Sequence, residues 1–307
     1  MLKVSIIGLG SLGGFIAARL SSLPDIQIQW VYRTYSLRKD KQVLLTSSSM
    51  SEPLVGYADT ISYNLEDVFG EIVFITTKAY DNSTLLEQTK TWKHKTIVLL
   101  QNGIGEDEKL AQGLAPNNAI VSAITHLKAS YTTSPYQVTL HNQLIDCIYA
   151  VYQGQPSSYL DYLLNNIFND VERESSSYHV RLPKLLISFA ANAASFLYDS
   201  DMRGLATNPK CRELMLEIEQ EFLPLFNALN LPAPTFPIYK LISLLDAPLY
   251  ENAYFSMKED SDNGRQVEFE EIFKASQKLA NQYNVPFILG HQVCQHINNI
   301  LQGENLS

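Results

Sequence analysis

The chain has 307 residues, 46% hydrophobic and 18% charged, and a formal net charge of -9 at pH 7. This length exceeds what one ordinary core fills, so we expect two domains of a globular protein rather than a disordered chain. We expect no nucleic-acid partner, because a net negative charge repels a polyanion and the sequence has no Lys/Arg cluster to offset it.

The sequence carries few signals for membranes, metals or disulfides. No apolar run approaches the roughly 18 residues that span a bilayer, and the start leads into a strand pattern without a cleavable signal. Three cysteines lie far apart, and six histidines form no i, i+4 pairs. We therefore expect a cytoplasmic protein with no membrane partner, metal site or disulfide.

The first half alternates short apolar runs with longer polar or helical stretches, which is typical of βαβ units and a parallel sheet. Ten of the fourteen glycines lie before residue 160, where tight strand-to-helix turns need them. The fold class predicted is thus an α/β Rossmann-type domain followed by an all-α domain. The predicted strands are Val4–Ile7, Ile26–Tyr32, Ile72–Thr76, Thr96–Leu100 and Ala119–Ala123.

Long helical periodicities begin after a Ser-rich stretch at residues 175–177. We place the boundary there, with a nucleotide-binding domain at 1–175 and a helical substrate and catalytic domain at 176–307. Three prolines in the second part mark a loop, because proline lacks the amide donor that a helix interior needs. The predicted helices are Leu185–Leu197, Arg212–Ala228 and Val267–Tyr283, and the loop prolines are Pro232, Pro234 and Pro237.

A glycine-rich turn follows the first predicted strand and opens an amphipathic helix. Its residues are Gly8, Leu9, Gly10, Ser11, Leu12 and Gly13, a G-x-G-x-x-G pattern. The glycines allow a tight turn, close approach of the pyrophosphate and close packing of helix on sheet. The helix N-terminus offers N–H groups to phosphates. The turn therefore predicts a dinucleotide site.

The end of the second strand selects the cofactor. An NAD site usually has Asp or Glu there for the ribose 2′-hydroxyl, whereas this chain has Arg33 among hydroxyl side chains. A guanidinium suits a 2′-phosphate, so NADPH is favoured over NADH. Arg38 is an alternative for the same role, and a solvated loop position is the alternative reading of Arg33.

Two polar residues follow later strands. Lys78 comes after the strand at 72–76, and Asn102 comes after the strand at 96–100. Ligands of open α/β sheets bind just past the carboxyl ends of the strands. Lys78 and Asn102 are therefore candidates to border the nicotinamide half of the cofactor, against the alternative of an ordinary loop lysine and turn asparagine.

The helix at 185–197 carries a polar stripe. Lys184, Ser188 and Asn192 are spaced i, i+4, i+8 in an otherwise apolar segment, so they share one face. Burying polar groups is costly without partners, so the stripe faces either a polar interior neighbour or a ligand site. Taken alone, the periodicity leaves both readings open.

Ser256 and Glu268 flank a loop rich in charge and glycine, and Glu268 begins the next helix. An acidic residue in a first helical turn also serves simply to complement the helix dipole. The spacing alone therefore leaves a structural and a functional role equally open.

Together these segments resemble the ketopantoate reductase (2-dehydropantoate 2-reductase) family. The resemblance extends in order over nearly the whole chain, and its motifs are specific only jointly. It rests on Gly8–Gly13, Arg33, Thr77–Tyr80, Gln101–Gly105, Lys184 with Asn192, and Ser256 followed twelve residues later by Glu268.

The resemblance implies NADPH-dependent reduction of ketopantoate to pantoate, in pantothenate biosynthesis. It implies that Lys184 is the general acid and that Glu268 holds the substrate hydroxyl. Hydride arriving at a ketone carbon builds negative charge on oxygen, which an ammonium stabilises. The implied substrate-binding residues are Asn102, Ser188, Asn192 and Ser256, and the implied cofactor-binding residues are Gly8–Gly13, Arg33, Lys78, Asn102 and Glu268.

The chain departs from the family pattern at two positions on the catalytic helix. Ser188 stands where the family has asparagine, and Leu182 stands where tryptophan is usual. Another 2-oxo acid is therefore an alternative substrate, and a noncatalytic NADPH-binding sensor is an alternative function. Retention of Lys184 and Glu268 argues against the sensor. The sequence leaves open whether an apolar helix face forms a homodimer.

Overall fold

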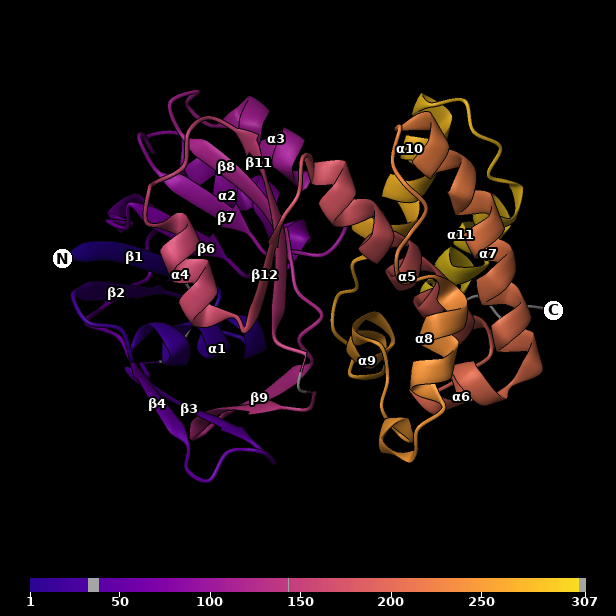
Figure 1. Cartoon of the computed structure of the whole chain (residues 1–307), viewed down its shortest axis with the longest axis horizontal. Coiled ribbons are helices and arrows are strands. Elements are labelled where there is room, and N and C mark those ends of the chain that lie inside the picture. The colour runs from indigo at the N-terminus through magenta and orange to yellow at the C-terminus, as the bar shows by residue number, and fades with distance from the viewer. Residues whose placement is uncertain (33–38, 143, 304–307) are drawn as a thin grey trace. The chain divides into compact units, whose positions relative to one another are not determined.

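The computed structural model describes residues 1–32, 39–142 and 144–303, and by internal contacts it divides into two compact units. The first unit comprises residues 1–101 and 106–180, and the second comprises residues 102–105 and 181–307. Figure 1 labels their elements. The predicted fold class is confirmed: a largely parallel sheet with helices, and then a helical unit.

The main sheet has eight strands in the order β12-β11-β8-β7-β6-β1-β2-β5. All pairs are parallel except that of β11 with β8. All five predicted strands are present, with ends within two residues of those predicted. The bounds are β1 Leu2–Ile7, β2 Ile26–Val31, β5 Thr60–Ser62, β6 Ile72–Ile75, β7 Thr96–Leu99, β8 Ala119–Ile124, β11 Asp146–Gln153 and β12 Asp170–Arg173.

The central strands are buried on both faces, which explains their continuous apolar runs. On one face, side chains of β1 such as Ile6 pack with α1 (Ser11–Leu20) and α4 (Leu160–Ile167). On the other, Ile75 packs with α2 (Asn82–Gln88) and α3 (Glu106–Gly113). The sheet is therefore sandwiched between helical layers, with its strand ends free to carry loops.

A second, four-stranded sheet lies against α1, and the apolar pattern did not predict it. Its order is β4-β3-β10-β9, and β10 pairs parallel with β3. Gly56 and Gly14 allow the close approach, since a Cβ would lie 2.6 Å from Ala18 Cα at Gly56 and 2.3 Å from the Tyr136 hydroxyl at Gly14. Figure 1 shows β3, β4 and β9 beside α1. The bounds are β3 Gln42–Ser47, β4 Leu54–Tyr57, β9 Ala129–Thr133 and β10 Tyr136–Leu140.

The second unit is built around α5, whose Phe189 ring packs against those of Phe222, Phe273 and Phe287. The helix begins at Ser177 rather than at the predicted Leu185, because the Ser176 hydroxyl accepts a hydrogen bond from His179 N, as an N-cap does. The helices are α5 Ser177–Leu197, α6 Met202–Thr207, α7 Pro209–Ala228, α8 Ile238–Leu245, α9 Ser256–Asp262, α10 Ala275–Gln282 and α11 Ile288–Leu301.

By length and composition alone, α5 is apolar enough to cross a membrane, contrary to the reading of the sequence. Of its most apolar 18-residue window, 72% is buried within the protein. The central helix of a helical domain has the same apolar composition, because such a helix is surrounded by other helices on most sides.

The secondary structure around Glu268, from Ser256 to Lys274, differs from the prediction. The stretch after Ser256, predicted as a loop, forms α9, which an i, i+4 pair between Lys258 and Asp262 supports. The next helix starts at Phe269 rather than Val267, and its first part is a π-helical turn, η4, at Glu270–Lys274. The proline loop is present between α7 and α8, although Pro183 and Pro224 lie inside helices.

Candidate functional site

The glycine turn is packed closely against the end of β6 and against its own backbone. Gly8 has φ +94°, a conformation that favours glycine, and a Cβ on Gly8 would lie 2.7 Å from Thr77 N. A Cβ on Gly13 would lie 2.0 Å from Gly8 O, so the first turn of α1 sits directly on the end of β1. Gly8 and Gly13 are therefore required by the turn itself.

Gly10 differs from Gly8 and Gly13, because within the described residues the nearest atom to a Cβ there, apart from its chain neighbours and its own helix backbone, would be Tyr131 Cε1 at 3.8 Å. It is the N-cap of α1, with φ -94°, and no side chain caps the helix. Ser11 and Leu12 begin the helix, and Leu9 is buried under the turn. The turn thus presents uncapped helix amides beside an open glycine, which fits a phosphate group.

Two hydroxyls that the sequence did not single out hold this turn. Thr76 Oγ1 donates to Gly8 O at 2.5 Å, and the buried Tyr136 hydroxyl donates to Gly10 O at 2.9 Å. Tyr136 comes from the second sheet and packs edge-on against Trp30. These two bonds fix the carbonyls of Gly8 and Gly10, and Gly8 N itself donates to Val31 O at 3.3 Å, so the backbone of the turn is held on both sides. Tyr136 begins β10 and pairs with Thr133 of β9, so the unpredicted second sheet places it here.

Lys78 lies just past β6, half-buried, as the N-cap of a 3-10 turn at Ala79–Asp81. Beside it, Gln101 Nε2 donates to Thr77 O at 3.0 Å and to Asn82 Oδ1 at 2.8 Å. The end of β7 is thereby tied to the loop after β6. Arg33 and Arg38, the candidates for a 2′-phosphate, lie outside the described residues.

In the second unit, two predicted residues meet. Asn102 Nδ2 donates to Glu268 Oε2 at 3.3 Å, across 166 positions of sequence. Glu268 is 1% exposed, and burial of a carboxylate is costly unless donors surround it. Asn102 is half-buried and provides one such donor. This bond joins two predicted site residues that lie far apart in the sequence.

The polar stripe of α5 is buried at one end. Lys184 and Ser188 are half-buried, whereas Asn192 is 2% exposed. Asn192 Nδ2 donates to Ser188 O at 2.7 Å, and its Oδ1 makes no hydrogen bond to the residues that the structure describes. Buried acceptors are normally satisfied, so an open one is a candidate to receive a ligand's donor.

Ser195 extends the stripe by one turn, and sequence reasoning missed it. It is fully buried, and its hydroxyl likewise has no hydrogen-bond partner within the described part of the chain. The i+3 spacing from Asn192 places both on one helix face. The polar face therefore continues deeper into the helical unit than the lysine and asparagine alone suggested.

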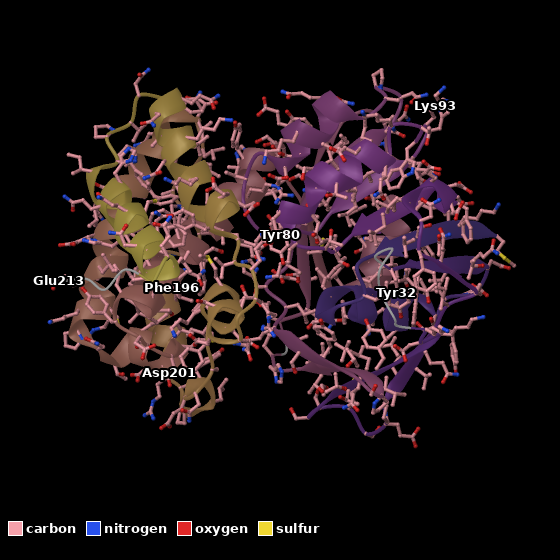
Figure 2. The ribbon with its side chains drawn as sticks, turned by 180° about the vertical axis from the view of Figure 1, so that it is seen from behind. Tyr32, Tyr80, Lys93, Phe196, Asp201 and Glu213 are labelled. Carbon is pink, nitrogen blue, oxygen red and sulfur yellow. The ribbon has the colours of Figure 1, made fainter. Side chains whose placement is uncertain are left out.

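Ser256 is exposed at the first position of α9. The segment before it is fixed by Asp201, labelled in Figure 2, whose Oδ2 accepts from Asn252 N at 2.7 Å. Lys258, largely buried, lies 2.9 Å from Asp199 Oδ1. Burial lowers the pKa of Lys258, but the bonds to Asp262 and Asp199 outweigh burial, so this pKa is raised overall. A charged Lys258 thus anchors the helix that carries Ser256.

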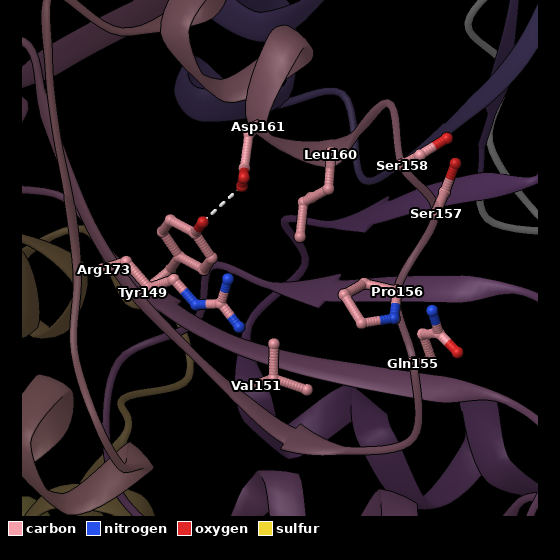
Figure 3. Close-up of a pocket in the computed structure, with 9 residues that line it drawn as sticks. All are labelled: Tyr149, Val151, Gln155, Pro156, Ser157, Ser158, Leu160, Asp161 and Arg173. Atoms are coloured by element: carbon pink, nitrogen blue, oxygen red, sulfur yellow. Dashed lines mark hydrogen bonds between the residues drawn. The ribbon is translucent and has the colours of Figure 1, made fainter.

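The first unit also has a pocket of its own (Figure 3). It is lined by β11 and the start of α4, including Tyr149, Asp161 and Arg173. The Tyr149 hydroxyl donates to Asp161, and burial together with that bond raises the pKa of Tyr149 to about 12. None of the predicted site residues lines this pocket. The described residues also hold no cluster of three His, Cys, Asp or Glu for a metal ion.

Comparisons with known proteins agree with this arrangement. The family models "Ketopantoate reductase PanE/ApbA" and its C-terminal counterpart match residues 4–146 and 177–301. A 2-dehydropantoate 2-reductase of Aquifex aeolicus is 26% identical over 229 residues, 70% of this chain and 71% of that protein.

Two solved structures share the fold at low identity. The 2-dehydropantoate 2-reductase of Methylococcus capsulatus has a TM-score of 0.81 at 20% identity, with 100% of this chain and 99% of that one covered. A D-mandelate dehydrogenase solved with NADH has a TM-score of 0.75 at 15% identity, with 99% and 100% covered. Likeness at this level concerns the fold.

The α/β unit with its glycine turn, followed by a helical unit, defines a dehydrogenase of the two-part dinucleotide-binding class. The chain belongs to the ketopantoate reductase family. It is accordingly an NAD(P)-dependent oxidoreductase acting on a CH–OH group.

Proposed function

We propose that the protein reduces 2-dehydropantoate to pantoate with NADPH, with residues 1–175 binding the cofactor and residues 176–307 supplying the catalytic groups. The observation that carries the proposal is the hydrogen bond between Asn102 and the buried Glu268. It joins an amide donor and a carboxylate acceptor, the groups that a substrate bearing both carboxylate and hydroxyl requires. A role in cytoplasmic pantothenate synthesis goes with this assignment.

Each of the proposed site residues then has a separate chemical role. Lys184 stabilises the charge that develops on the carbonyl oxygen and donates the proton to it. Glu268 accepts a hydrogen bond from the substrate hydroxyl, while Asn102 and Asn192 orient the substrate. Asn192 suits this role because its buried Oδ1 is open within the described residues. Ser256, at the start of α9, donates to the substrate carboxylate.

The glycine turn fits a dinucleotide, because a Cβ would fill the space at Gly8 and Gly13 and the helix amides are uncapped. Gly8–Gly13 would hold the pyrophosphate, Arg33 the 2′-phosphate, and Lys78, Asn102 and Glu268 the nicotinamide half. When bound, NADPH supplies the hydride. The chain supplies the proton and the placement of the ketone.

Cofactor preference tests the role of Arg33. We expect NADPH to bind at least about tenfold more tightly than NADH, about 1.4 kcal/mol, because a guanidinium pairs with the 2′-phosphate. Arg33→Ala should remove most of that difference. The measurement is the Kd of each cofactor by fluorescence titration, with the exposed Arg212 on α7 changed to Ala as the control. Equal affinities in the wild type would contradict NADPH selectivity.

Ser188 tests substrate discrimination. Ser188→Asn places a longer hydrogen-bonding side chain one turn from Lys184, while the Asn192 bond to the Ser188 backbone oxygen does not depend on this side chain. We expect kcat/KM for 2-dehydropantoate to rise relative to an analogue lacking the hydroxyl, by roughly 1 kcal/mol, one net hydrogen bond. Both substrates are assayed at saturating NADPH, with Ser188→Ala as the control. An unchanged ratio places Ser188 outside the substrate shell.

A screen of NADPH oxidation over branched and linear 2-oxo acids tests the function as a whole. The highest kcat/KM for 2-dehydropantoate is the expected result. Higher activity on another 2-oxo acid favours the alternative function, a reductase of that acid. Because a D-mandelate dehydrogenase shares the fold, the panel includes the 2-oxo acid that corresponds to mandelate. Tight NADPH binding without turnover of any acid would indicate a sensor.

A homodimer through the helical unit stays a prediction. Within that unit, α8 exposes large apolar side chains, with Tyr239 60% and Leu244 49% exposed. Scattered exposed apolar residues are normal, and a contiguous face is required for a dimer. Sedimentation of the wild type beside Leu244→Glu measures whether α8 contributes to assembly.

A further inference from the structure

A four-residue loop of the first half is packed as part of the helical unit. Residues 102–105 group by contacts with residues 181–307, although Gln101 and Glu106 on either side belong to the first unit. The two ends are joined through Asn82, whose Nδ2 lies 2.8 Å from Gln101 Oε1 and 2.7 Å from Glu106 Oε2. The loop therefore has fixed ends, and other residues determine where its tip lies.

One of those residues is Arg181, on α5. Its side chain is 1% exposed, and its Nη1 donates to Gly103 O at 3.2 Å. A guanidinium is rarely buried without hydrogen-bond acceptors, because removing its charge from water is costly. Arg181 lies one turn before Lys184 on the same helix, so the helix that carries the proposed acid also holds the loop.

The tip also packs against the π-helical turn η4. Gly103 has φ +86°, and a Cβ there would lie 2.5 Å from Glu271 O and 2.9 Å from Glu271 Cβ. Gly103 is thus held by two contacts, the bond from Arg181 and close packing on the backbone of η4. π-helical turns occur often at functional sites, where they set the direction of a side chain.

Asn102 and Glu268 lie directly beside these two supports. Asn102 precedes Gly103, Glu268 precedes the first turn of the η4 helix, and their hydrogen bond of 3.3 Å is long for an N–H to oxygen contact. A long bond holds its partners weakly, so the placement of Asn102 depends on the backbone that carries it. That backbone is fixed at Gly103.

We propose that Arg181 is a positioning residue, which sets Asn102 against Glu268 by binding the carbonyl of Gly103. This inference rests on the proposed function, because its consequence is the orientation of the carboxylate that receives the substrate hydroxyl. Small displacements of substrate-positioning groups have large kinetic effects. The effect of Arg181 therefore acts through Asn102 and falls on the 2-oxo acid, while the phosphate contacts of NADPH remain.

A double-mutant cycle separates this role from a purely structural one. Arg181→Lys keeps the charge but loses the planar fork, and Asn102→Ala removes the amide. We expect Arg181→Lys to raise KM for the 2-oxo acid about five- to tenfold, with the Kd of NADPH within about threefold of wild type. In the Asn102→Ala background, the same change should have little further effect on kcat/KM.

Additive losses in the two single variants, or wild-type kinetics for a folded Arg181→Lys, overturn the positioning role. If thermal melting shows that Arg181→Lys does not fold, the cycle is measured with Gly103→Ala, whose methyl group displaces the tip directly, and additivity there overturns it equally. A wild type that reduces no 2-oxo acid overturns the proposed function first, and this role with it.

Discussion

Replacing Lys184 by alanine is expected to lower kcat by about 100-fold or more, while the Kd of NADPH stays within about twofold of wild type. The ammonium acts on charge that appears on the carbonyl oxygen only as hydride arrives, so its loss raises the barrier by about 2.7 kcal/mol or more. Steady-state assays at saturating cofactor give kcat, and fluorescence titration gives the Kd.

The control for this variant is Lys278→Ala, an exposed lysine on α10 that removes the same charge elsewhere in the helical unit. It should leave kcat unchanged. A Lys184→Ala protein that retains kcat and loses NADPH affinity would show that the lysine serves the cofactor rather than the ketone. Matching melting temperatures for both variants would exclude a loss of folded protein as the cause.

The sequence predicted best what depends on local pattern. The strands β1, β6, β7 and β8 are largely apolar because helices cover both sheet faces, and such runs are recognisable one segment at a time. The glycine turn was found in the same way, because backbone geometry at Gly8 and Gly13 leaves room for no other residue. The stripe of Lys184, Ser188 and Asn192 followed from helical spacing alone.

What escaped prediction depends on contacts between distant segments. The second sheet pairs residues 42–47 with 136–140, and nothing in either strand identifies the other. For the same reason, the sequence did not indicate that Tyr136 donates to the Gly10 carbonyl. The sequence did not single out Arg181, because its burial and its bond to Gly103 depend on a loop that lies far from it in the chain.

Two glycines of the phosphate-binding turn should respond to the same substitution in different ways. Gly13→Ala would place its Cβ 2.0 Å from Gly8 O, a backbone atom that cannot rotate aside, so we expect loss of stability together with cofactor binding. At Gly10 the nearest described atom to the same methyl group, outside the local backbone, lies at 3.8 Å, and the φ of -94° is one that alanine adopts. Gly10→Ala should therefore fold normally.

Cofactor affinity, measured apart from stability, distinguishes the role of Gly10 from that of Gly13. If Gly10 is glycine so that the pyrophosphate can approach the backbone, its methyl group occupies the phosphate's place, and Gly10→Ala should weaken both NADPH and NADH by about tenfold or more. The ratio of the two affinities should not change, because the 2′-phosphate lies elsewhere. Melting temperature without ligand and Kd for each cofactor are measured on both variants. A Gly10→Ala protein that binds NADPH as wild type does would place the pyrophosphate away from this turn, and a destabilised one would mean that Gly10 serves the fold as Gly13 does.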